Sequence, residues 1–252
     1  MLPMRNKLSC ALIFSAGISV CFAVEKAVRL TPVILKAIPH DTTSFTQGLL
    51  YYSGMLYEST GIFGRSSLRC VDPADGRITK KIPVADLFAE GLARMGGKLV
   101  QLSWQENTAL IYVLPNLLQK GYYRYEGEGW GLTSDSSSFI MSDGSDTLFV
   151  RSLSFAVIKK IPVTLDGRAV KNLNELEYVK GIVYANVWQK SDIVAIRLKT
   201  GIVERVIDCS GLVRKAVIQN PEKVLNGIAY NPTSQTFFIT GKNWPIMFEV
   251  KW

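Results

Sequence analysis

Residues that could transfer a proton or donate hydrogen bonds recur ahead of tryptophans at matching intervals in this 252-residue chain. Glu90 lies 14 residues before Trp104, and Asn174 lies 14 residues before Trp188. A carboxyl group can accept and return a proton, and amide or ammonium groups can donate hydrogen bonds to a carbonyl oxygen. The shared spacing predicts that these side chains hold equivalent positions in equivalent structural repeats, close to one another.

Aromatic residues accompany the polar ones. Four of the five tryptophans, Trp104, Trp130, Trp188 and Trp244, fall at recurring places. Any one of them could simply pack the core, as aromatic residues often do. Together with the polar groups they favour a polar site with aromatic walls. The candidate residues are Phe45, Gln47, Phe88, Glu90, Trp104, Trp130, Asn174, Glu175, Trp188, Asn226, Lys242 and Trp244.

The segments that carry these residues are repeats. The apolar residues that follow the opening residues of each repeat are Leu49, Leu92, Leu132, Leu176 and Ile228. Their separations are 43, 40, 44 and 52 residues. Several short strands in each period of roughly 40–45 residues are typical of β-propeller blades. We therefore expect an all-β, five-bladed β-propeller with the candidate residues where five inner strands converge.

The two ends of the chain complement each other in strand content. The last repeat offers strands at 227–230, 235–240 and 246–251 but no fourth strand, whereas a spare strand-like segment precedes the first repeat. Pairing of this segment, 33–38, with 246–251 would complete the last blade and remove two exposed edges. We expect this N-terminal strand to close the ring.

The first residues have the pattern of a secretory signal peptide. Arg5 and Lys7 precede an apolar stretch at 8–20, and Ala23 ends a possible cleavage site. An uncleaved membrane anchor is the alternative, although the stretch is short for a spanning helix. We predict a signal peptide at 1–23, a single domain at 24–252, and a periplasmic or secreted protein without membrane association after cleavage.

Charge and metal-ligating residues exclude several classes of function. The formal net charge is +8, but the basic residues are spread along the chain without an arginine-rich arm, so nucleic-acid binding has little support. The only histidine is His40, and the two cysteines beyond the signal peptide, Cys70 and Cys209, lie in non-adjacent repeats. We expect both thiols to be unpaired and no typical zinc site to form.

Ten short motifs occur in sequence. They are FTQGL (45–49), ESTGIFGRSS (58–67), FAEGL (88–92), LSW (102–104), GWGLT (129–133), SDGS (142–145), LNELEY (173–178), ANVW (185–188), LNGIAY (225–230) and TGKNWP (240–245). In this order they resemble the plant-type, metal-independent glutaminyl cyclase family over about residues 45–250. The resemblance implies a five-bladed propeller, in agreement with the repeat count.

The resemblance also implies a reaction: an N-terminal glutamine cyclises to pyroglutamate with loss of ammonia. Such an intramolecular reaction needs positioning, oxyanion stabilisation and a proton shuttle, but no cofactor or metal. The implied catalytic residues are Glu90 as the proton shuttle, with Gln47, Asn174 and Lys242 as hydrogen-bond donors. The implied substrate-binding residues are Phe45, Phe88, Trp104, Trp130 and Trp188. The implied partners are peptides or proteins with N-terminal glutamine, and we expect a monomer.

Two alternative functions remain open from the sequence. One is a non-catalytic secreted propeller that binds peptides or glycans at its central mouth. The other is a metal-dependent propeller lactonase, which would need several carboxylates around one cation; Glu90 and Glu175 are the only acids at the openers, so this alternative is poor. For Glu175 and Glu177 we favour blade hydrogen bonding and a solvated face over catalysis.

Overall fold

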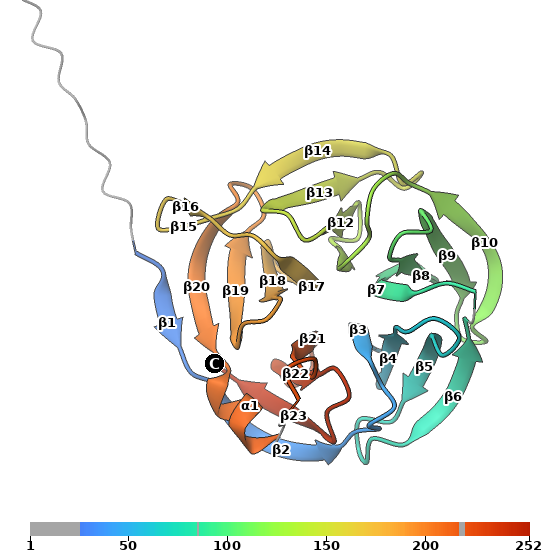
Figure 1. The fold of residues 1–252 in the computed structure, drawn as a ribbon, viewed down its shortest axis with the longest axis horizontal. Coiled ribbons are helices and arrows are strands. Elements are labelled where there is room, and N and C mark those ends of the chain that lie inside the picture. The colour runs from blue at the N-terminus through green and yellow to red at the C-terminus, as the bar shows by residue number, and fades with distance from the viewer. Residues whose placement is uncertain (1–25, 85, 217–219) are drawn as a thin grey trace, which may run out of the picture.

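The computed structural model describes residues 26–84, 86–216 and 220–252, so the predicted signal peptide at 1–23 lies outside the described residues. Within these ranges the chain forms five β-sheets and one short helix. Figure 1 shows the sheets set around a common centre, with the outermost strands at the rim. The fold is all-β and propeller-like. None of the helices in the described ranges is long and apolar enough to cross a membrane.

Three sheets each consist of four consecutive antiparallel strands. Tight turns join the strands; at Ser53–Gly54 both residues have positive φ, 52° and 83°, as a two-residue hairpin turn requires. The first sheet contains β3 (Thr46–Tyr52), β4 (Met55–Thr60), β5 (Ser67–Val71) and β6 (Ile78–Pro83). The second contains β7 (Ala89–Met95), β8 (Lys98–Ser103), β9 (Thr108–Val113) and β10 (Leu118–Arg124). The third contains β11 (Leu132–Ser134), β12 (Phe139–Met141), β13 (Thr147–Arg151) and β14 (Val157–Pro162).

The fourth sheet carries additional strands at its outer edge. Its main strands are β17 (Leu173–Val179), β18 (Ile182–Val187), β19 (Asp192–Arg197) and β20 (Ile202–Asp208). The added strands are β1 (Val28–Leu30), β15 (Thr164–Leu165) and β16 (Arg168–Ala169), with β1 and β15 both parallel to β20. Helix α1 (Ser210–Lys215) follows β20, where the sequence predicts a helical turn around 212–218; residues 217–219 lie outside the described ranges.

The fifth sheet joins the two ends of the described chain. It contains β21 (Leu225–Asn231), β22 (Thr236–Gly241), β23 (Ile246–Lys251) and β2 (Val33–Pro39). Strand β2 pairs antiparallel with β23, so that Val33 lies opposite Lys251 and Pro39 opposite Ile246. Each strand thereby covers an edge of the other that would otherwise expose unpaired backbone groups.

The inner strands are bulged where they begin. The register shifts between Thr46 and Gly48 in β3, and equivalent shifts occur near the start of β7, β17 and β21. A bulge bends a strand and redirects a side chain, which is why bulges are common beside active sites. Close approach explains the glycine at the start of β3: a Cβ on Gly48 would lie 2.6 Å from the backbone nitrogen of Leu92 on the neighbouring inner strand.

The core lies between the sheets. The five apolar residues that define the sequence period, Leu49, Leu92, Leu132, Leu176 and Ile228, are all at most 1% exposed. The inner strands therefore pack these apolar side chains between sheets, whereas the side chains two positions earlier in four of the repeats, those of Gln47, Glu90, Trp130 and Asn174, line the central mouth. Among the described residues, Cys70 and Cys209 are both free thiols, as the sequence predicts.

Candidate active site

One pocket at the centre of the propeller gathers every residue predicted to be catalytic or substrate-binding. Its volume is about 330 Å³, within the range of small-ligand sites. All of its residues lie at the starts of inner strands or just after the strands that follow, because these chain ends converge at one mouth. The predicted residues in its lining are Phe45, Gln47, Phe88, Glu90, Trp104, Trp130, Asn174, Trp188 and Lys242.

Burial separates the lining into two kinds of surface. The polar side chains of Gln47, Glu90, Asn174 and Lys242 belong to residues that are only 3–6% exposed. The five aromatic residues are half-buried. The pocket thus has a desolvated polar floor and aromatic walls. Electrostatic interactions in such an environment are stronger than in water.

Glu90 lies at the end of a chain of hydrogen bonds. Its Oε1 accepts a hydrogen bond from Gln47 Nε2 at 2.7 Å, and Gln47 Oε1 in turn accepts one from Asn226 Nδ2 at 3.1 Å. Burial raises the pKa of Glu90 well above its ordinary value; the Lys242 ammonium opposes this shift, and the charge of Glu128 adds to it. A carboxyl group with a raised pKa can serve as a general acid and base near neutral pH.

Lys242 is the cation of the pocket floor. Its Nζ lies 4.7 Å from the ring centroid of Phe45, which is a cation–π distance. Burial lowers the pKa of Lys242, whereas the charges of Glu90 and the exposed Glu222 raise it. An ammonium group at this position can stabilise negative charge that develops on a bound carbonyl oxygen.

Asn174 offers an unused acceptor. Its Oδ1 is buried and has no hydrogen-bond partner among the described residues. A buried polar atom without a partner is costly, and most such atoms are satisfied by water or a ligand. The Asn174 amide is therefore available to a polar group of a bound molecule.

Edge-to-face contacts hold the aromatic walls together. The ring centroids of Phe88 and Trp104 are 5.7 Å apart, as are those of Trp130 and Trp188. Glu128 Oε2 accepts hydrogen bonds from the indole nitrogens of both Trp104 and Trp130, at 2.9 and 3.0 Å. Although burial opposes ionisation, these bonds lower the pKa of Glu128. Glu128 thus stays charged and fixes two walls of the pocket.

Three other sequence candidates lie outside the pocket lining. Glu175 accepts backbone hydrogen bonds from Leu49 at 3.1 Å and from Ile228 at 2.8 Å, so it bonds three inner strands together, as the structural interpretation of this residue predicts. Asn226 orients Gln47 from behind. The expectation that Trp244 faces the mouth is wrong: it is 0% exposed and its indole donates to the Lys223 carbonyl.

Sequence reasoning missed three residues of the site. Ile62 and Glu222 line the pocket, and Glu128 holds its tryptophans. Ile62 belongs to the ESTGIFGRSS motif and has φ of 87°, a strained conformation for a β-branched residue that is found mainly at functional sites. Glu128 and Glu222 have no sequence signal, because both act through neighbours that only the fold supplies.

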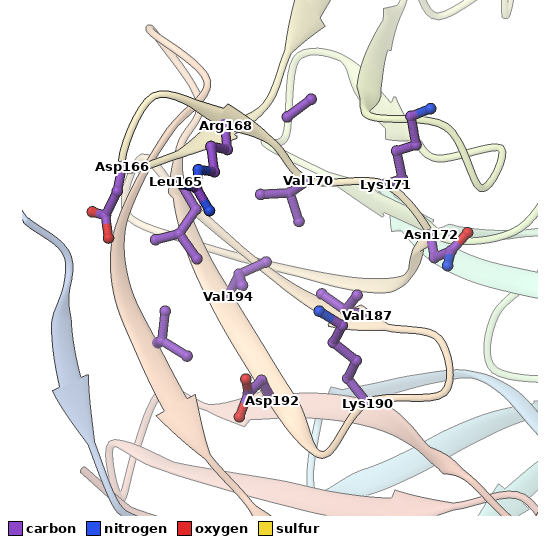
Figure 2. A pocket seen from close by; sticks show the side chains of 12 residues that line it. Leu165, Asp166, Arg168, Val170, Lys171, Asn172, Val187, Lys190, Asp192 and Val194 are labelled. Carbon is purple, nitrogen blue, oxygen red and sulfur yellow. The ribbon is translucent and has the colours of Figure 1, made fainter.

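A second cavity, of about 620 Å³, lies away from the mouth. Figure 2 shows it beside the strap, which we define as residues 164–172, with Val170, Val187 and Val194 directed into it. Of the charged residues that line it, Asp192 is half-buried and the others, Asp166, Arg168, Lys171 and Lys190, are exposed. This cavity contains none of the predicted site residues.

Comparison with known proteins identifies the family of the chain. Residues 8–252 match the family described as glutamine cyclotransferase. A glutaminyl-peptide cyclotransferase of Arabidopsis thaliana is 39% identical over 225 residues, which cover 86% of this chain and 70% of the relative. The crystal structure of Myxococcus xanthus glutaminyl cyclase superposes with a TM-score of 0.86 at 39% identity, covering 90% of this chain and 98% of that one. The chain belongs to the glutamine cyclotransferase family.

Proposed function

We propose that this protein is a glutaminyl-peptide cyclotransferase, which converts the N-terminal glutamine of peptides or proteins to pyroglutamate and releases ammonia. One observation carries the proposal: a buried carboxyl group with a raised pKa shares a small aromatic-walled pocket with a buried ammonium group and two amides. The family membership supports this catalytic function over a non-catalytic peptide or glycan binder.

In the proposed mechanism the substrate's α-amino nitrogen attacks the δ-carbon of its own side-chain amide. The new C–N bond closes the five-membered ring and places negative charge on the amide oxygen. Glu90 accepts the proton lost by the attacking nitrogen and gives it to the amide nitrogen, which leaves as ammonia. The α-amine has a reference pKa of about 7.7–8.0, so a carboxyl group with a raised pKa is matched to both transfers.

The other polar residues have complementary proposed roles. Lys242 and Asn174 hold the amide, with Lys242 stabilising the oxyanion. One N–H of Gln47 is already donated to Glu90, so we assign Gln47 to orient the proton shuttle, with its second N–H available to the substrate. The aromatic walls confine the glutamine side chain and exclude water.

The test is turnover of a peptide that begins with glutamine. The purified protein should release one ammonia per peptide, and the product should be about 17 mass units lighter than the substrate, the mass of ammonia. The same peptide with N-terminal asparagine or with an acetylated α-amine serves as the control. Absence of ammonia release from a folded protein would support the non-catalytic alternative. Chelator treatment should leave turnover intact, because the only histidine of the chain cannot build a usual zinc site.

We also propose that the five sheets are the blades of one ring, which β2 closes by completing the blade of β21–β23. The pairing of β2 with β23 supports this. From the signal-peptide pattern of the first residues we further propose one domain at 24–252 that acts as a monomer in the periplasm or outside the cell after cleavage of 1–23. N-terminal sequencing and light scattering of the mature protein test the cleavage and the oligomeric state.

A further inference from the structure

Two loops that carry neighbouring parts of the pocket wall are bonded to each other at the meeting of the first and fifth sheets. The loop between β2 and β3 leads to Phe45, and the loop between β22 and β23 contains Lys242. Asn243 N donates to the Ser44 carbonyl at 2.7 Å, and His40 N donates to the Pro245 carbonyl at 3.0 Å. Residues about 200 positions apart in the sequence thus form one wall.

The imidazole of His40 lies at the centre of this junction. Its Nδ1 is 2.8 Å from the Trp244 carbonyl oxygen, and its Nε2 is 2.9 Å from Glu58 Oε1. A carbonyl and a carboxylate are both acceptors. The Thr240 hydroxyl also lies 3.2 Å from Nδ1, but it donates its own proton to the Ile246 carbonyl at 3.1 Å, so both ring nitrogens carry a proton. The side chains of His40 and Glu58 are only 2% and 1% exposed, so this charged pair is shielded from solvent.

Glu58 extends the junction to both residues that flank Phe45. Its Oε1 accepts a hydrogen bond from Thr46 at 2.7 Å, and its Oε2 accepts one from Ser44 at 3.0 Å. The other charged groups of the cluster are Arg69, which is buried and bonded to Ser67, and Asp41, which lies 3.4 Å from Arg69. The four charges balance, and the cluster connects β4 and β5 to both loops.

We propose that His40, in its doubly protonated form, is a positioning residue that holds the Phe45 side of the pocket against the Lys242 side. This rests on the proposed cyclotransferase function. Loss of either hydrogen bond of His40 should release the loop that carries Lys242 and move its ammonium from the reacting amide. A displacement of about 1 Å can lower catalysis by up to roughly 100-fold.

The charge state of His40 makes the junction sensitive to alkaline pH. Burial alone would lower the pKa of His40, but the Glu58 carboxylate and the Trp244 carbonyl outweigh burial and raise it. Protonated His40 therefore stabilises the fold fully below about pH 6.5, and this stabilisation is lost as pH rises through the raised value. Burial opposes ionisation of Glu58 as well, yet His40 and Thr46 lower its pKa, so its contribution is lost only in acid.

NMR can measure the charge state directly, because the chain has one histidine. In untagged protein the ring signals of His40 should titrate above pH 6.5, and Glu58→Gln should move the midpoint to lower pH. This measurement is independent of turnover, so it stands or falls separately from the proposed function. A neutral His40 at pH 6.5 in the folded protein would overturn the proposal.

Kinetics test the positioning role. His40→Ala should lower kcat roughly 10–100-fold with a smaller change in KM, and His40→Gln, which keeps one donor, should restore part of kcat. Tyr112→Phe is the matched control: it removes another buried hydrogen bond, to Gln101, between two residues that do not line the pocket, and should leave kcat unchanged. If His40→Ala does not fold, the pH dependence of kcat of the wild-type protein decides. A kcat that stays constant over the pH range in which His40 titrates by NMR would exclude the positioning role.

Discussion

The strap cavity is larger than the central pocket, yet the central pocket holds the buried polar groups. The strap cavity has nearly twice the volume, about 620 against 330 Å³. Its buried surface consists of valines, and its basic side chains, such as Lys190, are exposed (Figure 2). The smaller pocket gathers buried polar groups from four sheets against aromatic rings. Convergence of desolvated polar groups, and not volume, identifies the site.

The physical reason lies in solvation. An exposed ammonium group is hydrated and screened, so it interacts only weakly with its neighbours. A buried carboxyl or ammonium group gives up hydration, which shifts its pKa and leaves its bonding capacity for a ligand. Glu90 and Lys242 show both effects.

The largest expected effect is the loss of the proton shuttle. Glu90→Gln keeps the shape and the contact with Gln47 but cannot accept a proton, so turnover should fall by roughly 10²–10⁴-fold. Steady-state ammonia release from folded protein measures it. Glu126→Gln is the matched control: Glu126 is exposed and does not line the pocket, so this variant should retain most activity. Near-wild-type turnover of Glu90→Gln would show that the buried carboxyl group does not identify the central pocket as the active site.

A smaller effect is expected from the pocket's hydrogen-bond donors. Lys242→Ala and Asn174→Ala should each lower kcat/KM by roughly 10–100-fold, because each removes a bond to the reacting amide, worth about 1–3 kcal/mol. The loss should fall mainly in kcat for Lys242, which acts on the developing oxyanion. Equal losses for a substrate analogue's binding and for kcat/KM would instead assign Lys242 to ground-state binding.

A change just below the pocket should affect stability more than turnover. In Glu175→Gln one carboxylate oxygen becomes a donor that faces the backbone N–H of Leu49 or Ile228, which should cost about 1–3 kcal/mol in the free energy of unfolding. Folded enzyme should keep most of its turnover, since Glu175 does not line the pocket. Urea unfolding and kcat measured on the same preparation test this, and a large fall in kcat at unchanged stability would contradict it.

The smallest effect is expected at the strap cavity. Lys190→Ala removes an exposed ammonium group. The equilibrium constant of unfolding and kcat/KM should each change by no more than about twofold, as for most surface substitutions. Compared with Lys242→Ala, it changes the same residue type in the other cavity. A loss of more than 10-fold toward glutamine peptides would show that the strap cavity takes part in substrate binding.

Much of the site was predictable because its residues are tied to the repeat. The openers around Gln47, Glu90 and Asn174 precede a periodic apolar residue, and that residue must be buried between sheets. Gln47, Glu90 and Asn174 each lie two positions before that residue, where regular alternation would place them on the same buried face. The bulge at the start of each inner strand directs them to the mouth instead. The prediction for Trp244 was wrong because this residue belongs to the same TGKNWP motif as Lys242. It lies two positions further along the chain, and its ring is buried in the core.

The sequence by itself determined the period and the all-β class, because repetition places equivalent residues at equivalent positions. The family that its motifs resemble implied nine of the eleven described residues that line the pocket. Only the tertiary structure decided which other side chains hold the pocket and its inner strands in place. Glu128 bridges two tryptophans of the second and third repeats, Glu175 bonds three inner strands, and His40 bonds to a carbonyl 204 positions away. Such contacts depend on the packing of sheets around the axis, where burial makes each hydrogen bond necessary.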